Sequence, residues 1–189
     1  MTHLKYAAAA RAAELKSSGP VLPTTAPTNA AAVAAADLVV IAVPHGAVVE
    51  VVAELADVLA GKVVVDATNP VNDTYTDLTT SGVSAGEALQ KQLPGVAVVK
   101  AFNTTFASRY AAPTEDGSPV DVFLVGDNSA AKRTVGEFAR SLGFRVIDAG
   151  GLRLARSLEE MAFLNISLNA GNGLPFHSAW KLVGPVVPS

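Results

Sequence analysis

Short runs of apolar residues alternate with segments of helical periodicity along most of the chain. Two of these runs, Leu38–Val43 and Val63–Val65, are apolar at every position rather than at alternate positions. Because such a run suits a strand that is covered on both faces, it predicts a parallel sheet between layers of helices. The strands predicted in this way are Val21–Thr25, Leu38–Val43, Val63–Asp66, Val96–Ala101, Val120–Val125 and Arg145–Asp148.

Between these runs, apolar residues recur every three or four positions, as one face of a helix requires. The segment 46–60 has valine or leucine at positions 48, 51, 52, 55 and 59, and it ends before Gly61, a residue suited to a helix C-cap. The other predicted helices are Tyr6–Lys16, Thr28–Ala36, Ser84–Gln92, Ser129–Leu142, Leu152–Leu168 and Leu174–Val183. Alternating strands and helices indicate βαβ units and therefore an α/β fold.

The two ends of the chain differ from its middle. No strand precedes the helix predicted at Tyr6–Lys16, so we expect an incomplete Rossmann-like parallel sheet with helices on both faces and a C-terminal helical tail. Residues 1–150 are interpreted as a truncated dinucleotide-binding domain and residues 151–189 as a C-terminal helical and dimerisation segment. Exposed sheet edges and apolar faces are normally covered. We therefore expect the Leu152–Leu168 helix, with Phe176 and Trp180, to cover such a surface in a homodimer.

The composition narrows the classes of function. Half of the 189 residues are hydrophobic and 16% are charged, which is typical of a globular domain. The net charge is −3 and basic residues are scattered, so no patch for nucleic acid or an anionic membrane is expected. The sequence has no cysteine, which excludes disulfides and thiolate chemistry. No apolar run approaches the ~20 residues of a transmembrane helix, and residues 1–11 do not resemble a signal peptide, so we expect a cytoplasmic protein.

Candidate chemistry is concentrated in loops that follow the predicted strands. In a parallel α/β sheet, ligands bind at the carboxyl ends of the strands. Loops 43–46, 66–70, 101–105 and 126–128 are rich in Asn, Thr, Pro and Gly. Turn formation alone explains any one of them, but four such loops on one edge favour a polar ligand site. Asn69 precedes a rigid Pro70, and Asn103 and Thr104 are expected to open a short helix that faces the ligand.

Few residues suggest acid–base or metal chemistry. His45 follows a predicted strand, where it would act as an acid, a base or a phosphate or ribose ligand, although a histidine in a polar loop is more often simply solvated. We expect no metal site, because the sequence has no HExxH or similar cluster. Glu159 and Glu160 are interpreted as a solvated helix face. No catalytic residue can be named from these patterns.

Several segments together resemble one enzyme family. Lys62–Val71 reads KVVVDATNPV and Val98–Ala107 reads VVKAFNTTFA, and both are similar to segments of the NADP oxidoreductase, coenzyme F420-dependent family, which includes NADPH-dependent coenzyme F420 reductases. The resemblance extends from about residue 30 to residue 181. It includes Asp121–Asp127, Ile147–Arg153 and Leu158–Leu164.

The resemblance implies hydride transfer between the nicotinamide of NADP and a deazaflavin (coenzyme F420) or flavin ring. In such a reaction the cofactors carry the chemistry, and the protein aligns the two rings and excludes water. The loops after the second and third predicted strands are then expected to lie beside the nicotinamide, and the loop after the fourth beside the acceptor ring. The residues expected to bind the cofactors are Val43, Pro44, His45, Thr68, Asn69, Pro70, Ala101, Asn103 and Thr104.

The sequence departs from the family at its beginning. Family members start with a strand, a G-x-G-x-x-G/A turn, a helix and a second strand, whereas no glycine precedes Gly19 here. The first strand–helix–strand unit and its phosphate cradle are thus expected to be missing, and NADPH to bind weakly or not at all. Two interpretations stay open: an NADP-linked reductase, and a redox-silent relative that is a small-molecule binding protein or a non-redox enzyme such as a cyclase or isomerase.

Overall fold

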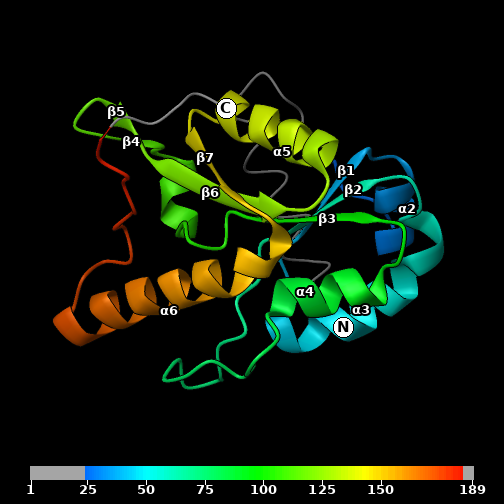
Figure 1. Ribbon diagram of the computed structural model, residues 1–189, viewed down its shortest axis with the longest axis horizontal. Helices are drawn as coiled ribbons and strands as arrows, with labels where there is room; N and C mark the ends of the chain where they lie inside the picture. The colour runs from blue at the N-terminus through cyan, green and yellow to red at the C-terminus, as the bar shows by residue number, and fades with distance from the viewer. Residues whose placement is uncertain (1–23, 185–189) are drawn as a thin grey trace.

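A five-stranded sheet forms the centre of the computed structural model, which describes residues 24–184 (Figure 1). The strand order is β1-β2-β3-β6-β7, and β1, β2 and β3 run parallel to one another. The strands of this sheet are β1 (Leu38–Ile41), β2 (Val63–Asp66), β3 (Ala97–Ala101), β6 (Asp121–Gly126) and β7 (Arg145–Gly150). Each lies within two residues of its predicted position, and the α/β Rossmann-like fold class is confirmed.

The prediction of a wholly parallel sheet is wrong at one pair. Strand β6 runs antiparallel to β3, with Ala101 opposite Leu124, and β7 is parallel to β6. The segment between β3 and β6 holds a short 3₁₀ helix, η3 (Ala107–Tyr110), and a hairpin of β4 (Thr114–Glu115) and β5 (Ser118–Pro119). A parallel connection needs a long crossover, usually a helix, and this segment contains none, so the chain returns in the opposite direction.

Helices cover both faces of the sheet. Helix α5 packs on one face, and α3, α4 and α6 lie on the other side (Figure 1). The α-helices are α2 (Asn29–Ala34), α3 (Val48–Leu55), α4 (Ala85–Gln92), α5 (Ser129–Ser141) and α6 (Ala155–Asn172). Three further 3₁₀ helices are η1 (His45–Ala47), η2 (Ala56–Val58) and η4 (Leu152–Leu154).

The central strands are buried on both faces, which explains why most of their positions are apolar. Val64 and Val98 pack in the cluster that contains residues of α3 and α4, whereas Val65 and Val99 pack in the cluster that contains residues of α5. All four side chains are at most 1% exposed. Because successive residues of a strand point to opposite faces, these four positions are covered by packed side chains on either side and are apolar. The next positions along the same strands hold the buried polar residues Asp66 and Lys100.

Two predictions at the ends of the chain have different outcomes. The helix predicted at Tyr6–Lys16 lies outside the described residues, as do positions 21–23 of the first predicted strand, and positions 24 and 25 are not in a strand. The helix predicted at Leu174–Val183 is wrong, because residues 174–184 are irregular. Helix α6 ends at a left-handed Gly173 (φ 63°), and Pro175 cannot continue it.

Side-chain contacts hold this C-terminal tail, residues 174–184, against the body of the protein. Ser108 Oγ donates a hydrogen bond to the Phe176 carbonyl (2.8 Å), and Trp180 Nε1 donates to the Met161 carbonyl (3.2 Å). Arg145 donates to the Leu182 carbonyl at 2.5 Å. Among the helices of residues 24–184, none has the length and apolar character that a bilayer-crossing segment needs.

Candidate functional site

Three of the four predicted loops meet at the carboxyl ends of β1, β2 and β3. We call this place the carboxyl edge. His45 follows β1, Thr68–Pro70 follows β2, and Asn103 follows β3. Loop 126–128 lies at the opposite edge, because β6 is antiparallel to β3 and places Gly126 beside Val99. The prediction that all four loops share one edge is therefore wrong for this loop.

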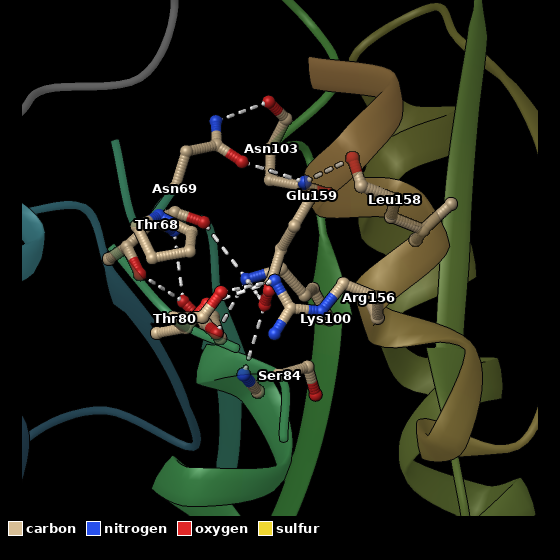
Figure 2. Close-up of polar contacts among 12 residues, drawn as sticks. Thr68, Asn69, Thr80, Ser84, Lys100, Asn103, Arg156, Leu158 and Glu159 are labelled. Atoms are coloured by element: carbon tan, nitrogen blue, oxygen red, sulfur yellow. Dashed lines mark hydrogen bonds and ion pairs between the residues drawn. The ribbon is translucent and has the colours of Figure 1, made fainter. Parts of the chain in front are cut away.

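Two asparagines join the loops after β2 and β3. Asn69 Nδ2 donates to the Asn103 carbonyl (2.8 Å), and Asn103 Nδ2 donates to Asn69 Oδ1 (3.0 Å). Asn103 Nδ2 also donates to the Leu158 carbonyl of α6 at 3.0 Å (Figure 2). The pair thus fixes the position of two loops and one helix relative to one another.

The segment after β3 does not open a helix, contrary to the prediction. Helix η3 starts only at Ala107, with Phe106 before it, whereas Asn103 and Thr104 lie in a turn and are 6% and 4% exposed. Phe102 has a left-handed backbone (φ 67°) although it is not glycine, and its buried ring packs on Phe138 with a centroid distance of 5.9 Å. A buried residue held in this conformation is typical of a site whose backbone direction the surrounding packing imposes.

A buried ionic cluster lies below this turn. Lys100 Nζ donates to Asp66 Oδ2 (2.8 Å) and to the Thr68 carbonyl (2.9 Å), and it is 3.1 Å from Glu159 Oε1 (Figure 2). Lys100, Asp66 and Glu159 are each at most 1% exposed. The interpretation of Glu159 as a solvated residue is therefore wrong, whereas Glu160 is exposed. The signal for this cluster was Lys100 itself, since a lysine inside an apolar strand requires buried carboxylate partners.

A glycine lets α4 approach the cluster closely. The Gly86 amide donates to Glu159 Oε1 at 3.2 Å. A Cβ atom on Gly86 would lie 3.0 Å from Ala155 Cβ and 3.3 Å from Lys100 Cδ, so a larger residue would push the helices apart. Ser84 caps this end of α4 in a capping box with Glu87, which fixes the position of the helix start.

The remaining predicted residues differ in their surroundings. The Thr68 amide and hydroxyl both donate to Asp66 Oδ1, at 2.9 and 2.8 Å. The Ala101 side chain is fully buried in the cluster on the α5 side, so only its backbone is available at the edge. Pro44 is exposed, Val43 and Asn69 are half-buried, and Pro70 is buried.

Three polar atoms at the carboxyl edge are buried and have no hydrogen-bond partner. They are His45 Nδ1, Asn103 Oδ1 and Thr104 Oγ1. An unpaired buried polar atom costs about 1–3 kcal/mol, so native proteins seldom leave one without a reason. His45 follows β1, whereas Asn103 and Thr104 follow β3, and β2 lies between these two strands. The three atoms are candidates for hydrogen bonds to a polar ligand group.

The electrostatic surroundings of His45 favour its neutral form. Burial lowers the pKa of His45 most strongly, the Asp66 carboxylate raises it, and the Lys100 ammonium lowers it. The net pKa lies below the ordinary value of 6.5. At neutral pH the ring is therefore uncharged and offers one hydrogen-bond donor and one acceptor.

The sequence is similar to a family of redox proteins. The family model described as NADP oxidoreductase, coenzyme F420-dependent, matches residues 5–70. The F420-dependent NADP reductase of Methanothermobacter thermautotrophicus is 34% identical over 155 residues, 77% of this chain and 66% of that protein. The rat metalloreductase STEAP3 is 42% identical over 105 residues, 56% of this chain and 21% of that protein. The chain thus spans only part of the length of each relative.

A solved structure extends the similarity to the fold. A crystal structure from Arthrobacter sp. FB24, of a protein assigned as an F420-dependent NADP reductase, superposes with a TM-score of 0.72 at 32% sequence identity. The match covers 80% of this chain and 71% of that one. The chain therefore belongs to the family of coenzyme F420-dependent NADP oxidoreductases.

Proposed function

We propose that the protein is an NADP-linked oxidoreductase of the F420-dependent NADP reductase type, which transfers hydride between NADPH and a deazaflavin or flavin. The relatives supply the class of reaction. In this chain, the proposal rests on three unpaired buried atoms at the carboxyl edge: His45 Nδ1, Asn103 Oδ1 and Thr104 Oγ1. A carboxamide offers both a donor and an acceptor, so the amide of a nicotinamide fits these atoms in chemical type.

Each side chain then has a distinct role in binding. Asn103 Oδ1 accepts a hydrogen bond from the carboxamide, and Thr104 Oγ1 or neutral His45 donates one to it. The Asn69–Asn103 pair keeps the two loops at a fixed separation. When bound, the nicotinamide and deazaflavin rings supply the hydride chemistry themselves. The protein aligns the rings and excludes water, which agrees with the small number of acid–base residues at this edge.

The proposed cofactor-binding residues are those predicted from the sequence. For the nicotinamide end they are Val43, Pro44, His45, Thr68, Asn69 and Pro70, and for the acceptor ring the loop of Ala101, Asn103 and Thr104. Since Ala101 is fully buried, it takes part through its backbone alone. Asn103 and Thr104 would then lie beside the two rings, where they could bind the nicotinamide carboxamide as well as the acceptor ring.

We propose that residues 1–189 by themselves bind NADPH weakly. That sequence has no G-x-G-x-x-G/A turn, and each charge-assisted contact to a phosphate contributes about 1.5–3 kcal/mol. Without such a turn, affinity comes mainly from the nicotinamide end and falls by orders of magnitude. The second candidate function is a redox-silent relative that binds a small molecule or catalyses a non-redox reaction. The polar side chains of His45, Asn69 and Asn103 at the carboxyl edge would suit this function without a dinucleotide.

Turnover with a hydride acceptor separates the two functions. NADPH oxidation is followed with coenzyme F420, FMN or FAD as acceptor, for the wild-type chain, Thr104→Val and a control, Thr134→Val. Thr134 is exposed on α5, whereas the Thr104 hydroxyl is buried at the carboxyl edge. We expect Thr104→Val to lower kcat/KM about tenfold, the equivalent of one lost hydrogen bond, and the control to leave it unchanged. Absence of turnover with all three acceptors at millimolar NADPH would reject the reductase and favour the redox-silent alternative.

A further inference from the structure

A cavity of about 470 Å³ lies apart from the residues of the carboxyl edge. Helix η3, the β4–β5 hairpin and the C-terminal tail line it. Its volume is within the range of small-molecule binding sites. The residues that matter to its chemistry are Arg109, Glu115, Asp116, His177, Trp180 and Lys181.

Arg109 is a buried cation in the wall of this cavity. The residue is 1% exposed, and a charge so deeply buried needs an anion and a full set of hydrogen bonds. Its Nη2 is 2.8 Å from Glu115 Oε2, and its Nη1 is 2.6 Å from His177 Nε2. Its Nε has no partner. Because a guanidinium only donates hydrogen bonds, His177 Nε2 accepts and supplies no negative charge.

The carboxylate that faces Arg109 is held loosely. The side chain of Glu115 is 67% exposed, so most of its hydration is kept in the ion pair. It lies just before the two-residue turn of the hairpin, where Asp116 and Gly117 both have positive φ (47° and 75°). Because the Glu115 carboxylate stays largely hydrated, it loses little when it leaves the pair, whereas the buried Arg109 needs another anion in its place. Glu115 therefore occupies a position from which an incoming anion can displace it.

The rest of the cavity suits an apolar or aromatic body. Trp180 is fixed by the hydrogen bond from its Nε1 to the Met161 carbonyl, and Pro119, Val120 and Ala179 also line the wall. Lys181, which donates to the Pro119 carbonyl and lies 3.6 Å from Asp121, adds a second cation at the same wall. Asp116 makes a ligand with a second anionic group unfavourable.

We propose that this cavity binds a small molecule with one anionic group, a carboxylate or a phosphate ester, on an aromatic or apolar body. The anionic group pairs with Arg109 and displaces Glu115, and the body contacts Trp180. An Arg fork matches both anions in geometry. The proposal goes beyond the reductase function, since it uses none of the residues at the carboxyl edge, and either of the two can fail alone.

Calorimetric titration with phenyl phosphate, benzoate and inorganic phosphate tests this site. We expect phenyl phosphate or benzoate to bind at least about tenfold more tightly than inorganic phosphate, because only they carry an apolar body. Tighter binding of phenyl phosphate than of benzoate would indicate that the site prefers a phosphate ester, and the reverse order would indicate a carboxylate. In Glu115→Gln the competing carboxylate is lost, so affinity should rise about three- to tenfold. Glu50→Gln, an exposed residue on α3, is the matched control and should bind like the wild type.

Arg109→Lys keeps the positive charge but loses the paired N–H donors of the guanidinium, so binding of the aromatic probes should weaken about tenfold or more. If Arg109→Lys prevents folding, Lys181→Gln is tested in its place. This variant removes the second cation of the cavity and should also weaken binding of the probes. Absence of binding by both aromatic probes at millimolar concentration overturns the proposal. Equal affinities for the wild type and Glu115→Gln also overturn it, since the probe would then bind elsewhere.

Discussion

At the scale of single residues, Lys100 is the residue on which the buried cluster depends most. Its ammonium group contacts Asp66, Glu159 and one carbonyl, and all three side chains are at most 1% exposed. Removal of one partner of a buried ion pair costs about 3–5 kcal/mol, because the other charge stays buried. We therefore expect Lys100→Met to lower the free energy of unfolding by about that amount in urea titrations.

A combined variant is the control for this prediction. Lys100→Met with Asp66→Asn and Glu159→Gln removes all three charges together, and it should recover a large part of the lost stability. A Lys100→Met protein that unfolds at the wild-type urea concentration would contradict the cluster as described. So would a triple variant that is less stable than Lys100→Met alone.

His45 provides a pH-dependent prediction. Its pKa in the folded protein lies below 6.5, chiefly because of burial. Between the folded pKa and the unfolded value of about 6.5 the unfolded chain binds more protons, so the free energy of unfolding falls as the pH drops through this window. His45→Gln should lack this component of the pH dependence. NMR titration of the imidazole measures the pKa directly, and a midpoint at or above 6.5 would contradict the burial of the ring.

The approach of Asn69 and Asn103 could be predicted from sequence, whereas the burial of Glu159 could not. Both asparagines directly follow buried parallel strands, and such strand ends lie at one edge. Glu159 follows apolar residues on a helix whose pattern does not show which face is inside. Its burial depends on Lys100 and on the lack of a side chain at Gly86, which lie far away in sequence.

At the scale of whole elements, the C-terminal tail is attached through Asp121, the first residue of β6. Asp121 Oδ2 accepts from the Leu182 amide (2.6 Å), and Arg145 donates to both of its oxygens. Burial raises the pKa of Asp121, but the hydrogen bonds from Arg145 and Leu182 and the charges of Arg145 and Lys181 outweigh it, and the pKa is lowered. The ionised carboxylate is therefore stabilised in the folded state.

The lowered pKa predicts a loss of stability in acid. The contribution of Asp121 is fully present above its unfolded pKa and is lost as the pH falls below about 4, through the folded pKa. Asp121→Asn should lower the free energy of unfolding at neutral pH by about 1–3 kcal/mol and flatten the pH dependence below about pH 4. Urea titrations at several pH values measure both effects. If the free energy of unfolding of Asp121→Asn falls below about pH 4 as steeply as that of the wild type, other carboxylates are responsible for the loss of stability in acid.

The positions of the strands could be predicted from sequence, but their directions and the path of the tail could not. A continuous apolar run shows that both faces are covered and says nothing about the direction of the strand. The only local sign of the reversal at β6 was Asp116-Gly117, a pair typical of tight hairpin turns, in a linker that lacks a helical pattern. The tail is held by contacts with Ser108, Arg145 and Met161, which are distant in sequence.

At the scale of the whole molecule, helix α6 has an unusual distribution of residues. Its buried side includes the polar residues Glu159, Asn165 and Asn169, whereas Leu164 and Leu168 are 50% and 44% exposed. The apolar positions that predicted an amphipathic helix therefore do not all face the core. Exposed leucines on one side of a long helix are typical of a surface that a partner covers.

We predict that this side of α6 pairs with a second copy of the chain in a homodimer, with residues 151–189 as the dimerisation segment. A two-fold axis beside α6 would place Leu164 and Leu168 against the same residues of the other subunit. One contact would then bury the exposed leucines of both subunits. Leu164→Glu with Leu168→Glu places like charges in that contact and should give a monomer, whereas Val49→Glu, at a 61% exposed valine on α3, should leave the dimer intact. Light scattering at micromolar concentration measures the mass of each. If the wild-type chain is a monomer there, the two leucines remain exposed to water and the predicted dimer does not exist.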